Sequence, residues 1–259
     1  MSMHIPPVVH RQSSTAEALT SRVTASTSTT SPSSNIGDRL ATHQVLPMYM
    51  AVDTSSSMSF RLNSVERAIF RMREELIVSP LLGEKTRIAI LEFSDRANLL
   101  LPLSDLTELR TIPRLHSSGS TRFGPLFRLL SRIIEQDLRV LHARATVSYR
   151  PFIFLIIDSD PVDDWIKSYD AFTSKVHPNL ITIALGKVGK STMRRLHPTM
   201  IADFQNVSDG QELELKLFNI FNEYAQSLTN STMRRTARGD VRYPEIRTLD
   251  EPFDDTDLW

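Results

Sequence analysis

Between residues 45 and 228, short apolar runs alternate with amphipathic segments, and this alternation constrains the fold more than any other feature of the chain. Compact apolar runs indicate strands, whereas apolar residues spaced three and four apart indicate helices. The expected strands are LPMYMAVD at 46–53, TRIAILEF at 86–93, ANLLLPL at 97–103, PFIFLIID at 151–158, NLITIAL at 179–185 and MIADFQNV at 200–207. Strands that alternate with helices are typical of an α/β domain.

Three helices can be placed from their apolar positions. The apolar stripes of the first two consist of Val65, Ile69, Met72 and Leu76, and of Phe127, Leu130, Ile133 and Ile134, and the last helix covers 212–228. The polar SDRAN segment between Phe93 and Leu99 predicts a hairpin, which makes one edge of the sheet antiparallel. We therefore expect a Rossmann-like three-layer sandwich with a mostly parallel sheet and helices on both faces.

The two ends of the chain differ in composition from this body. Residues 1–44 are rich in Ser and Thr and contain few large apolar side chains, so we expect a disordered tail. Residues 229–259 are first rich in Arg and then acidic, and we expect a second flexible tail there. The folded domain is predicted to span 45–228.

Charge and composition exclude several classes of function. Thirty basic residues balance thirty acidic ones, so the chain lacks the broad positive field of a nonspecific nucleic-acid binder. The absence of cysteine removes disulfides and thiolate metal sites, and the seven histidines show no paired metal-binding spacing. No membrane span or secretory signal is evident, and we expect a soluble cytoplasmic protein.

Oxygen-bearing side chains follow three of the expected strands. Asp53, Ser55 and Ser57 lie in the segment after the first strand, Thr121 lies in the HSSGSTRFG segment after the third, and Asp158 ends the FIFLIID run. Ligand sites of open α/β sheets lie in the loops beyond the carboxyl ends of the strands. Oxygen donors of this kind suit Mg²⁺ or Mn²⁺, and a cation held partly by neutral hydroxyls retains charge for an external carboxylate.

The DTSSSM segment, the threonine loop and FLIIDSDPVDDW resemble the metal-ion-dependent adhesion site of von Willebrand factor A domains. The LPMYMAVDTSSSM and D-x-x-P-x-D-D-W blocks are similar to the TerY-type proteins of bacterial tellurite-resistance gene clusters. The resemblance covers roughly 45–228. It implies a non-enzymatic module in which a divalent cation bridges to a partner's Glu or Asp, with a kinase or phosphatase encoded nearby as companion.

The chain departs from this pattern at two positions, since Ser56 and Ser159 replace glycines that are usual in the family. If those positions required positive φ, serine would strain the loops and weaken metal binding. A simpler interpretation of the first loop is also open: Asp53 and Ser57 would cap the helix that begins near Leu62.

Three other motifs allow different interpretations. FIFLIIDSDPV also fits the nucleophile strand of haloacid-dehalogenase-type phosphatases, with Asp158 as nucleophile and Asp160 as acid or base. ALGKVGKS at 184–191 matches a relaxed phosphate loop containing Lys190, although a plain strand-to-helix connection is the preferred interpretation. The Asp163-Asp164-Trp165 block predicts a helix cap, formed by either acid, and a tryptophan packed on the sheet.

The acidic end of the chain offers one candidate ligand for the predicted site. DEPFDDTDLW, residues 250–259, combines carboxylates with Phe253, Leu258 and Trp259. This segment is expected to act as an internal ligand or as a ligand for a neighbouring molecule.

Overall fold

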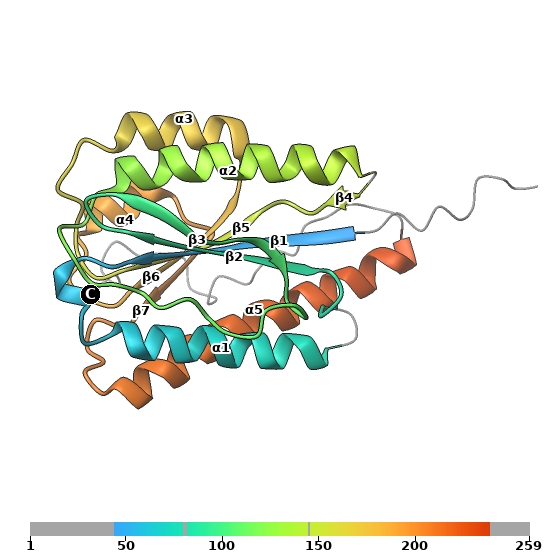
Figure 1. The fold of residues 1–259 in the computed structure, drawn as a ribbon, viewed down its shortest axis with the longest axis horizontal. Helices are drawn as coiled ribbons and strands as arrows, with labels where there is room; N and C mark the ends of the chain where they lie inside the picture. The colour runs from blue at the N-terminus through green and yellow to red at the C-terminus, as the bar shows by residue number, and fades with distance from the viewer. Residues whose placement is uncertain (1–43, 80–81, 145, 239–259) are drawn as a thin grey trace, which may run out of the picture. The chain divides into compact units, whose positions relative to one another are not determined.

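A seven-stranded sheet forms the centre of the computed structural model, which describes residues 44–79, 82–144 and 146–238 (Figure 1). The strand order is β3-β2-β1-β5-β6-β7, and β4 pairs with the start of β1. The strands are β1 Gln44–Asp53, β2 Thr86–Phe93, β3 Ala97–Asp105, β4 Val147–Ser148, β5 Phe152–Ile157, β6 Asn179–Ala184 and β7 Met200–Asp203. Among these described strands, only β2 and β3 pair antiparallel.

The helices cover both faces of this sheet (Figure 1). α1 and α5 pack on one face and α2, α3 and α4 on the other, and each face has its own hydrophobic cluster. The helices are α1 Leu62–Val78, α2 Phe123–Ala143, α3 Ile166–Val176, α4 Lys190–Leu196 and α5 Gly210–Arg238, with a short 3₁₀ turn, η1, at Ser56–Met58. This arrangement is the three-layer sandwich that the sequence predicts.

The central strands are apolar along almost their whole length because helices cover them on both sides. All six residues of β5 are buried, and in β1 only Gln44 is partly exposed. Along β1, Met48 and Met50 face the cluster under α1 and α5, whereas Tyr49 and Ala51 face α2. The alternation of side chains across a strand thus supplies both layers of the core.

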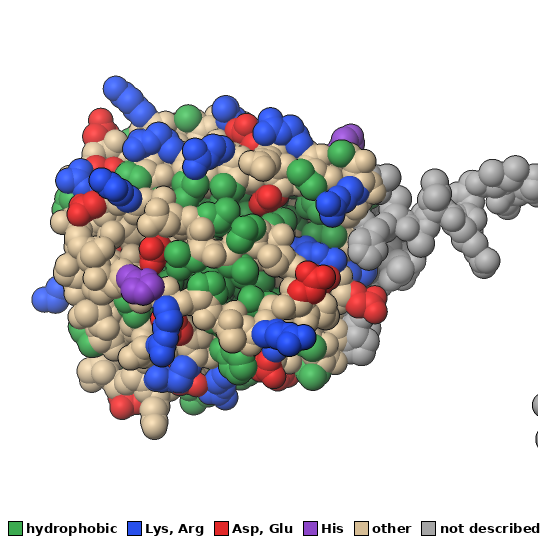
Figure 2. Space-filling model, viewed as in Figure 1, with side chains coloured by type: hydrophobic (Ala, Val, Ile, Leu, Met, Phe, Trp, Pro, Cys, Tyr) green, Lys and Arg blue, Asp and Glu red, His purple; other side chains and the backbone are tan. Residues whose placement is uncertain are grey.

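The edge strand β3 closes one side of the sheet. Hydrophobic side chains gather in the middle of the face shown in Figure 2, over β3, which is only partly buried along its length. Pro102 lies within β3 and has no backbone N–H to offer, and the β2–β3 pairing shifts register between Ile88 and Leu91. Both features disfavour the addition of another strand at this edge.

The positions of the first five predicted strands and of the β2–β3 hairpin are confirmed, whereas the strand predicted at 200–207 ends at Asp203, before a turn in which Val207 N donates to Phe204 O. The two-residue strand β4 was not predicted, because two residues carry no periodic signal. α5 continues to Arg238, so the first ten residues of the tail expected at 229–259 are helical. The rest of that tail, 239–259, and residues 1–43 of the tail expected at 1–44 lie outside the described residues. No helix within the described ranges is both long and apolar enough to cross a membrane.

Candidate metal centre

Two buried carboxylates lie at the same edge of the sheet. Asp53 is the last residue of β1 and Asp158 directly follows β5, and their exposed fractions are 0% and 5%. β1 and β5 are adjacent and parallel, so their carboxyl ends meet at one edge. This relationship brings together two acids that are far apart in the sequence.

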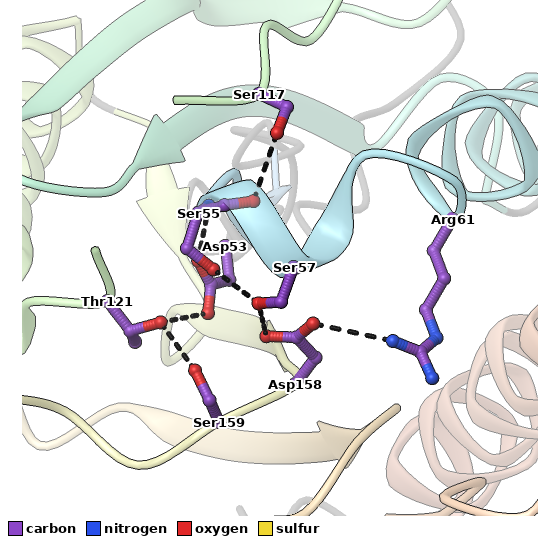
Figure 3. Close-up of polar contacts among 8 residues, drawn as sticks. All are labelled: Asp53, Ser55, Ser57, Arg61, Ser117, Thr121, Asp158 and Ser159. Atoms are coloured by element: carbon purple, nitrogen blue, oxygen red, sulfur yellow. Dashed lines mark hydrogen bonds and ion pairs between the residues drawn. The ribbon is translucent and has the colours of Figure 1, made fainter. Parts of the chain in front are cut away.

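Two serines, Ser55 and Ser57, connect these carboxylates (Figure 3). Ser55 donates its backbone N–H to Asp53 Oδ1 at 2.8 Å, and its Oγ lies 3.1 Å from Ser57 Oγ. Ser57 Oγ then donates to Asp158 Oδ1 at 2.9 Å. Asp53, Ser55 and Ser57 therefore point toward one region, and the 3₁₀ turn η1 places Ser57 there.

Thr121 completes the group from the segment before α2. Its Oγ1 donates to Asp53 Oδ2 at 2.9 Å and lies 2.7 Å from Ser159 Oγ. Backbone hydrogen bonds hold this segment against the β1 loop, from Ser118 N to Thr54 O at 2.8 Å and from Ser56 N to Gly119 O at 3.0 Å. Gly119 has a φ of 69°, a left-handed conformation that favours glycine.

The structure therefore brings all five predicted site residues into one hydrogen-bonded network: Asp53, Ser55, Ser57, Thr121 and Asp158. Within the described residues, no group of three or more His, Cys, Asp or Glu side chains could hold a metal ion. A cation at this edge would therefore depend on hydroxyl ligands beside two carboxylates. Such hard oxygen donors fit Mg²⁺ or Mn²⁺.

The buried position of Asp53 changes its acidity. Burial raises the pKa of the Asp53 carboxyl from 3.8 to about 6, and the negative charge of Asp158 adds to this rise. Hydrogen bonds from Ser55 and Thr121 oppose the rise because they stabilise the ionised carboxylate. The metal-free site thus holds a proton more readily than an exposed aspartate does.

Ser56 and Ser159 do not produce the backbone conflict considered above. Among the described non-glycine residues, only His177 and His197 have positive φ. Ser56 Oγ donates to Gly119 O at 3.1 Å, and Ser159 Oγ contacts Thr121. Both serines therefore take part in the hydrogen bonds that join the loops.

Arg61 is a member of the site that the sequence analysis missed. Its Nη1 lies 3.4 Å from Asp158 Oδ2, so it contacts the carboxylate oxygen that Ser57 leaves free (Figure 3). Only its place four residues after Ser57, just before α1, could have suggested this contact. The chain contains thirty Lys and Arg residues, and this position alone does not single out Arg61.

Neither the helix cap that the simpler interpretation of the first loop allows nor the cap predicted for the helix after Trp165 is formed. No side-chain cap is present at the start of α1, and Ser57 bonds Asp158 instead. No side-chain cap precedes α3 either, because Asp163 accepts hydrogen bonds from the backbone N–H groups of Phe123 and Gly124, both at 2.9 Å. Asp163 therefore caps α2.

Trp165 is buried among aromatic side chains on the α2 face of the sheet. Its ring centroid lies 5.3 Å from that of Phe123 and 5.5 Å from that of Tyr169. The same hydrophobic cluster includes sheet residues such as Tyr49 and Leu155. Trp165 thus belongs to the core between the sheet and the helices α2 and α3, which confirms the predicted packing on the sheet.

Among the described residues, Asp160 forms no hydrogen bond with Asp53 or Asp158. Its Oδ1 accepts hydrogen bonds from Gly189 N at 2.9 Å and from Thr192 Oγ1 at 2.6 Å, at the start of α4. The 184–191 segment forms the end of β6, a connection and the first residues of α4, as a plain strand-to-helix connection predicts. Asp160 thus accepts the hydrogen bond of the Gly189 backbone N–H, directly before α4.

No protein-family model and no curated protein matches the chain. The fold is similar to that of several solved structures. A von Willebrand factor type A protein from Catenulispora acidiphila matches with a TM-score of 0.51 and 12% identity, over 70% of this chain and 42% of that structure.

A pilus adhesin and a minor pilin are also similar in fold to this chain. The pilus adhesin SpaC from Lactobacillus rhamnosus GG, in its open conformation, matches with a TM-score of 0.54 and 12% identity, over 70% of this chain and 30% of that structure. A mutant of the PilB minor pilin from Streptococcus sanguinis matches with a TM-score of 0.51 and 11% identity, over 74% of this chain and 64% of that structure. The chain spans less than two thirds of each structure, and it has the Rossmann-like α/β fold of von Willebrand factor A domains.

Proposed function

We propose that this domain is a metal-dependent protein-interaction module and not an enzyme. The observation that carries the proposal is the hydrogen-bonded network of five oxygen-bearing residues at the carboxyl edge of the sheet. Mg²⁺ or Mn²⁺ would be held by Ser55, Ser57 and Thr121 together with Asp53 and Asp158. When bound, the cation would supply positive charge for a Glu or Asp carboxylate of a protein partner.

The charged and the neutral side chains would contribute differently to cation binding. Asp53 and Asp158 supply the negative charge that attracts a cation into a buried position, and both are almost completely buried. The hydroxyls of Ser55, Ser57 and Thr121 supply oxygen without further negative charge. A donor set of this composition leaves the cation attractive to an external carboxylate.

The phosphatase interpretation is the second candidate, and two hydrogen bonds of Asp160 argue against it. A nucleophilic Asp158 requires Asp160 as acid or base, but Asp160 is engaged at the start of α4 by Gly189 and Thr192. A phosphatase would hydrolyse p-nitrophenyl phosphate with Mg²⁺ and lose this activity in Asp158→Asn. We expect no hydrolysis by either protein.

We also propose what kind of protein supplies the carboxylate that binds the cation. The similar solved structures include a pilus adhesin and a minor pilin, which supports a role in protein contacts. The resemblance of the sequence to TerY-type proteins favours a cytoplasmic partner, such as a kinase or phosphatase encoded nearby, in tellurite resistance or a related stress response. The chain's own 250–259 segment is the candidate internal ligand, since it places carboxylates beside apolar side chains.

Direct measurement of metal binding tests the proposal. We expect Mn²⁺ to bind the wild-type chain in a calorimetric titration and not to bind Asp53→Ala. Asp164→Ala is the matched control, because Asp164 is an exposed acid in the loop after β5 with no described contact to the five residues. Equal Mn²⁺ affinity in all three proteins would overturn the proposal. Partner capture with and without a chelator then tests whether binding proteins depend on the metal.

A further inference from the structure

Arg61 brings a positive charge to the candidate metal centre. Its guanidinium Nη1 lies 3.4 Å from Asp158 Oδ2, and the exposed fractions of the two side chains are 15% and 2%. Ser57 occupies the other oxygen of the same carboxylate, at 2.9 Å. Figure 3 shows the arginine reaching from the start of α1 to the outer side of Asp158.

The local structure keeps Arg61 in this place. The Arg61 backbone N–H donates to Met58 O, and its carbonyl accepts hydrogen bonds from Ser64 and Val65 in the first turn of α1. The guanidinium carbon lies 4.3 Å from the centre of the Phe60 ring. Arg61 Nε is buried and has no hydrogen-bond partner among the described residues. The arginine is therefore largely removed from water and directed at one acid.

The charge balance of the metal-free site depends on this arginine. Asp53 and Asp158 are both buried, and the negative charge of Asp158 makes ionisation of Asp53 more costly. Within the described part of the chain, Arg61 is the only basic residue that forms an ion pair with either carboxylate. A buried carboxylate without a counter-charge destabilises a folded protein.

We propose that Arg61 is the resident counter-cation of the Asp53–Asp158 site. In the metal-free protein it neutralises Asp158 and stabilises the closely packed loops. When a divalent cation enters, the same positive charge opposes it, because like charges at short range repel strongly in a partly buried site. Arg61 is thus a positioning residue that sets how tightly the site holds metal. The inference about affinity rests on the proposed function.

Titration of the full chain with Mn²⁺ tests the effect on affinity. We expect Arg61→Gln to bind Mn²⁺ about fivefold or more tightly than wild type, because the opposing charge is removed. Arg61→Lys keeps the charge and should stay within about twofold of wild type. Arg122→Gln is the matched control, since Arg122 pairs with the exposed Asp95 at the same edge of the sheet, and its Mn²⁺ affinity should not change. Equal or weaker binding by Arg61→Gln would overturn the effect on affinity.

Thermal unfolding in a chelator independently tests whether Arg61 stabilises the metal-free protein as the counter-charge of Asp158. Without metal, Arg61→Gln should unfold at a lower temperature than wild type, and Arg61→Lys should recover most of the difference. Saturating Mn²⁺ should narrow the gap between wild type and Arg61→Gln. An Arg61→Gln protein as stable as wild type in the chelator would refute the counter-cation role. If wild type binds no Mn²⁺, the proposed function fails, whereas this comparison still decides whether Arg61 neutralises Asp158.

Discussion

Thr121 donates a hydrogen bond to Asp53 across 2.9 Å, although the two residues are 68 positions apart in the sequence. Both side chains are buried, with exposed fractions of 2% and 0%. The bond joins the segment before α2 to the end of β1. It therefore ties the assembly of the candidate metal centre to the topology of the sheet.

Replacement of Thr121 by valine should weaken metal binding and also lower the stability of the fold. The change keeps the shape of the side chain but removes the hydroxyl, so Asp53 loses one donor and the proposed cation one ligand. We expect Mn²⁺ affinity to fall by about tenfold or more. The free energy of unfolding should fall by about 1–2 kcal/mol, the usual effect of leaving a buried polar group unpaired.

Calorimetric titration and urea unfolding measure these two effects. Thr121→Ser is the matched control, because it retains the hydroxyl and should keep most of the affinity. Undiminished Mn²⁺ binding in Thr121→Val would exclude this threonine from the ligand set.

The five candidate ligands could be predicted because each follows a recognisable strand or lies in a loop at the same edge. Asp53 and Asp158 end apolar runs, and parallel neighbours necessarily bring such ends together. The layers of the fold were predictable for the same reason, since the apolar runs and helical stripes are long. These features are local in the sequence and repeat along it.

Contacts between distant segments could not be predicted in this way. Asp163 lies three residues before α3 but caps α2, whose first residue is 40 positions away. The position of Asp163 in the sequence points only to the adjacent helix, α3. Arg61 was missed for the same reason, because its partner Asp158 is 97 positions away. Tertiary packing determines both contacts.

Removal of the Asp163 carboxylate should destabilise the domain. Its two oxygens accept the backbone N–H groups of Phe123 and Gly124, which the first turn of α2 leaves without helical partners. We expect Asp163→Ala to lower the free energy of unfolding by about 1–2 kcal/mol. Urea unfolding measures this loss.

Asp164→Ala is the control for this prediction, because Asp164 is an exposed neighbour. Its stability should lie within about 0.5 kcal/mol of wild type. Equal losses in the two variants would show that general charge, and not the cap of α2, is responsible.

The elevated pKa of Asp53 predicts that metal binding depends on pH. Because the folded-state pKa is about 6 and the ordinary value is 3.8, the metal-free folded protein holds this proton more tightly than the unfolded chain does. The contribution of Asp53 to stability is therefore fully present below about pH 4 and is lost as pH rises through 6. A divalent cation requires the ionised form, so it competes with this proton.

We expect Mn²⁺ affinity to be nearly constant above pH 7 and to fall progressively as pH drops below 6. Titrations at pH 7.5, 6.5 and 5.5 measure this change. The melting-temperature increase caused by Mn²⁺ should shrink in parallel. An affinity that does not change between pH 7.5 and 5.5 would contradict the assignment of Asp53 as a group that must lose its proton.

The acidic 250–259 segment predicts an effect of truncation. If this segment occupies the metal centre, removal of residues 248–259 should increase the affinity for any other acidic ligand, because the internal competitor is lost. A synthetic peptide with the sequence of 248–259 is a suitable probe. In the presence of Mn²⁺, this peptide should bind the truncated chain more tightly than it binds the full chain.

Two controls separate recognition by the metal centre from general charge attraction. Peptide binding to the truncated chain should disappear in a chelator and in the truncated Asp53→Ala variant, whereas truncated Asp164→Ala should bind normally. The peptide carries several carboxylates, so nonspecific attraction to basic side chains would weaken with salt but would persist in the chelator. Equal affinity of the peptide for the full and truncated chains would show that residues 248–259 do not compete for the site, and an external partner would then be the remaining source of the carboxylate.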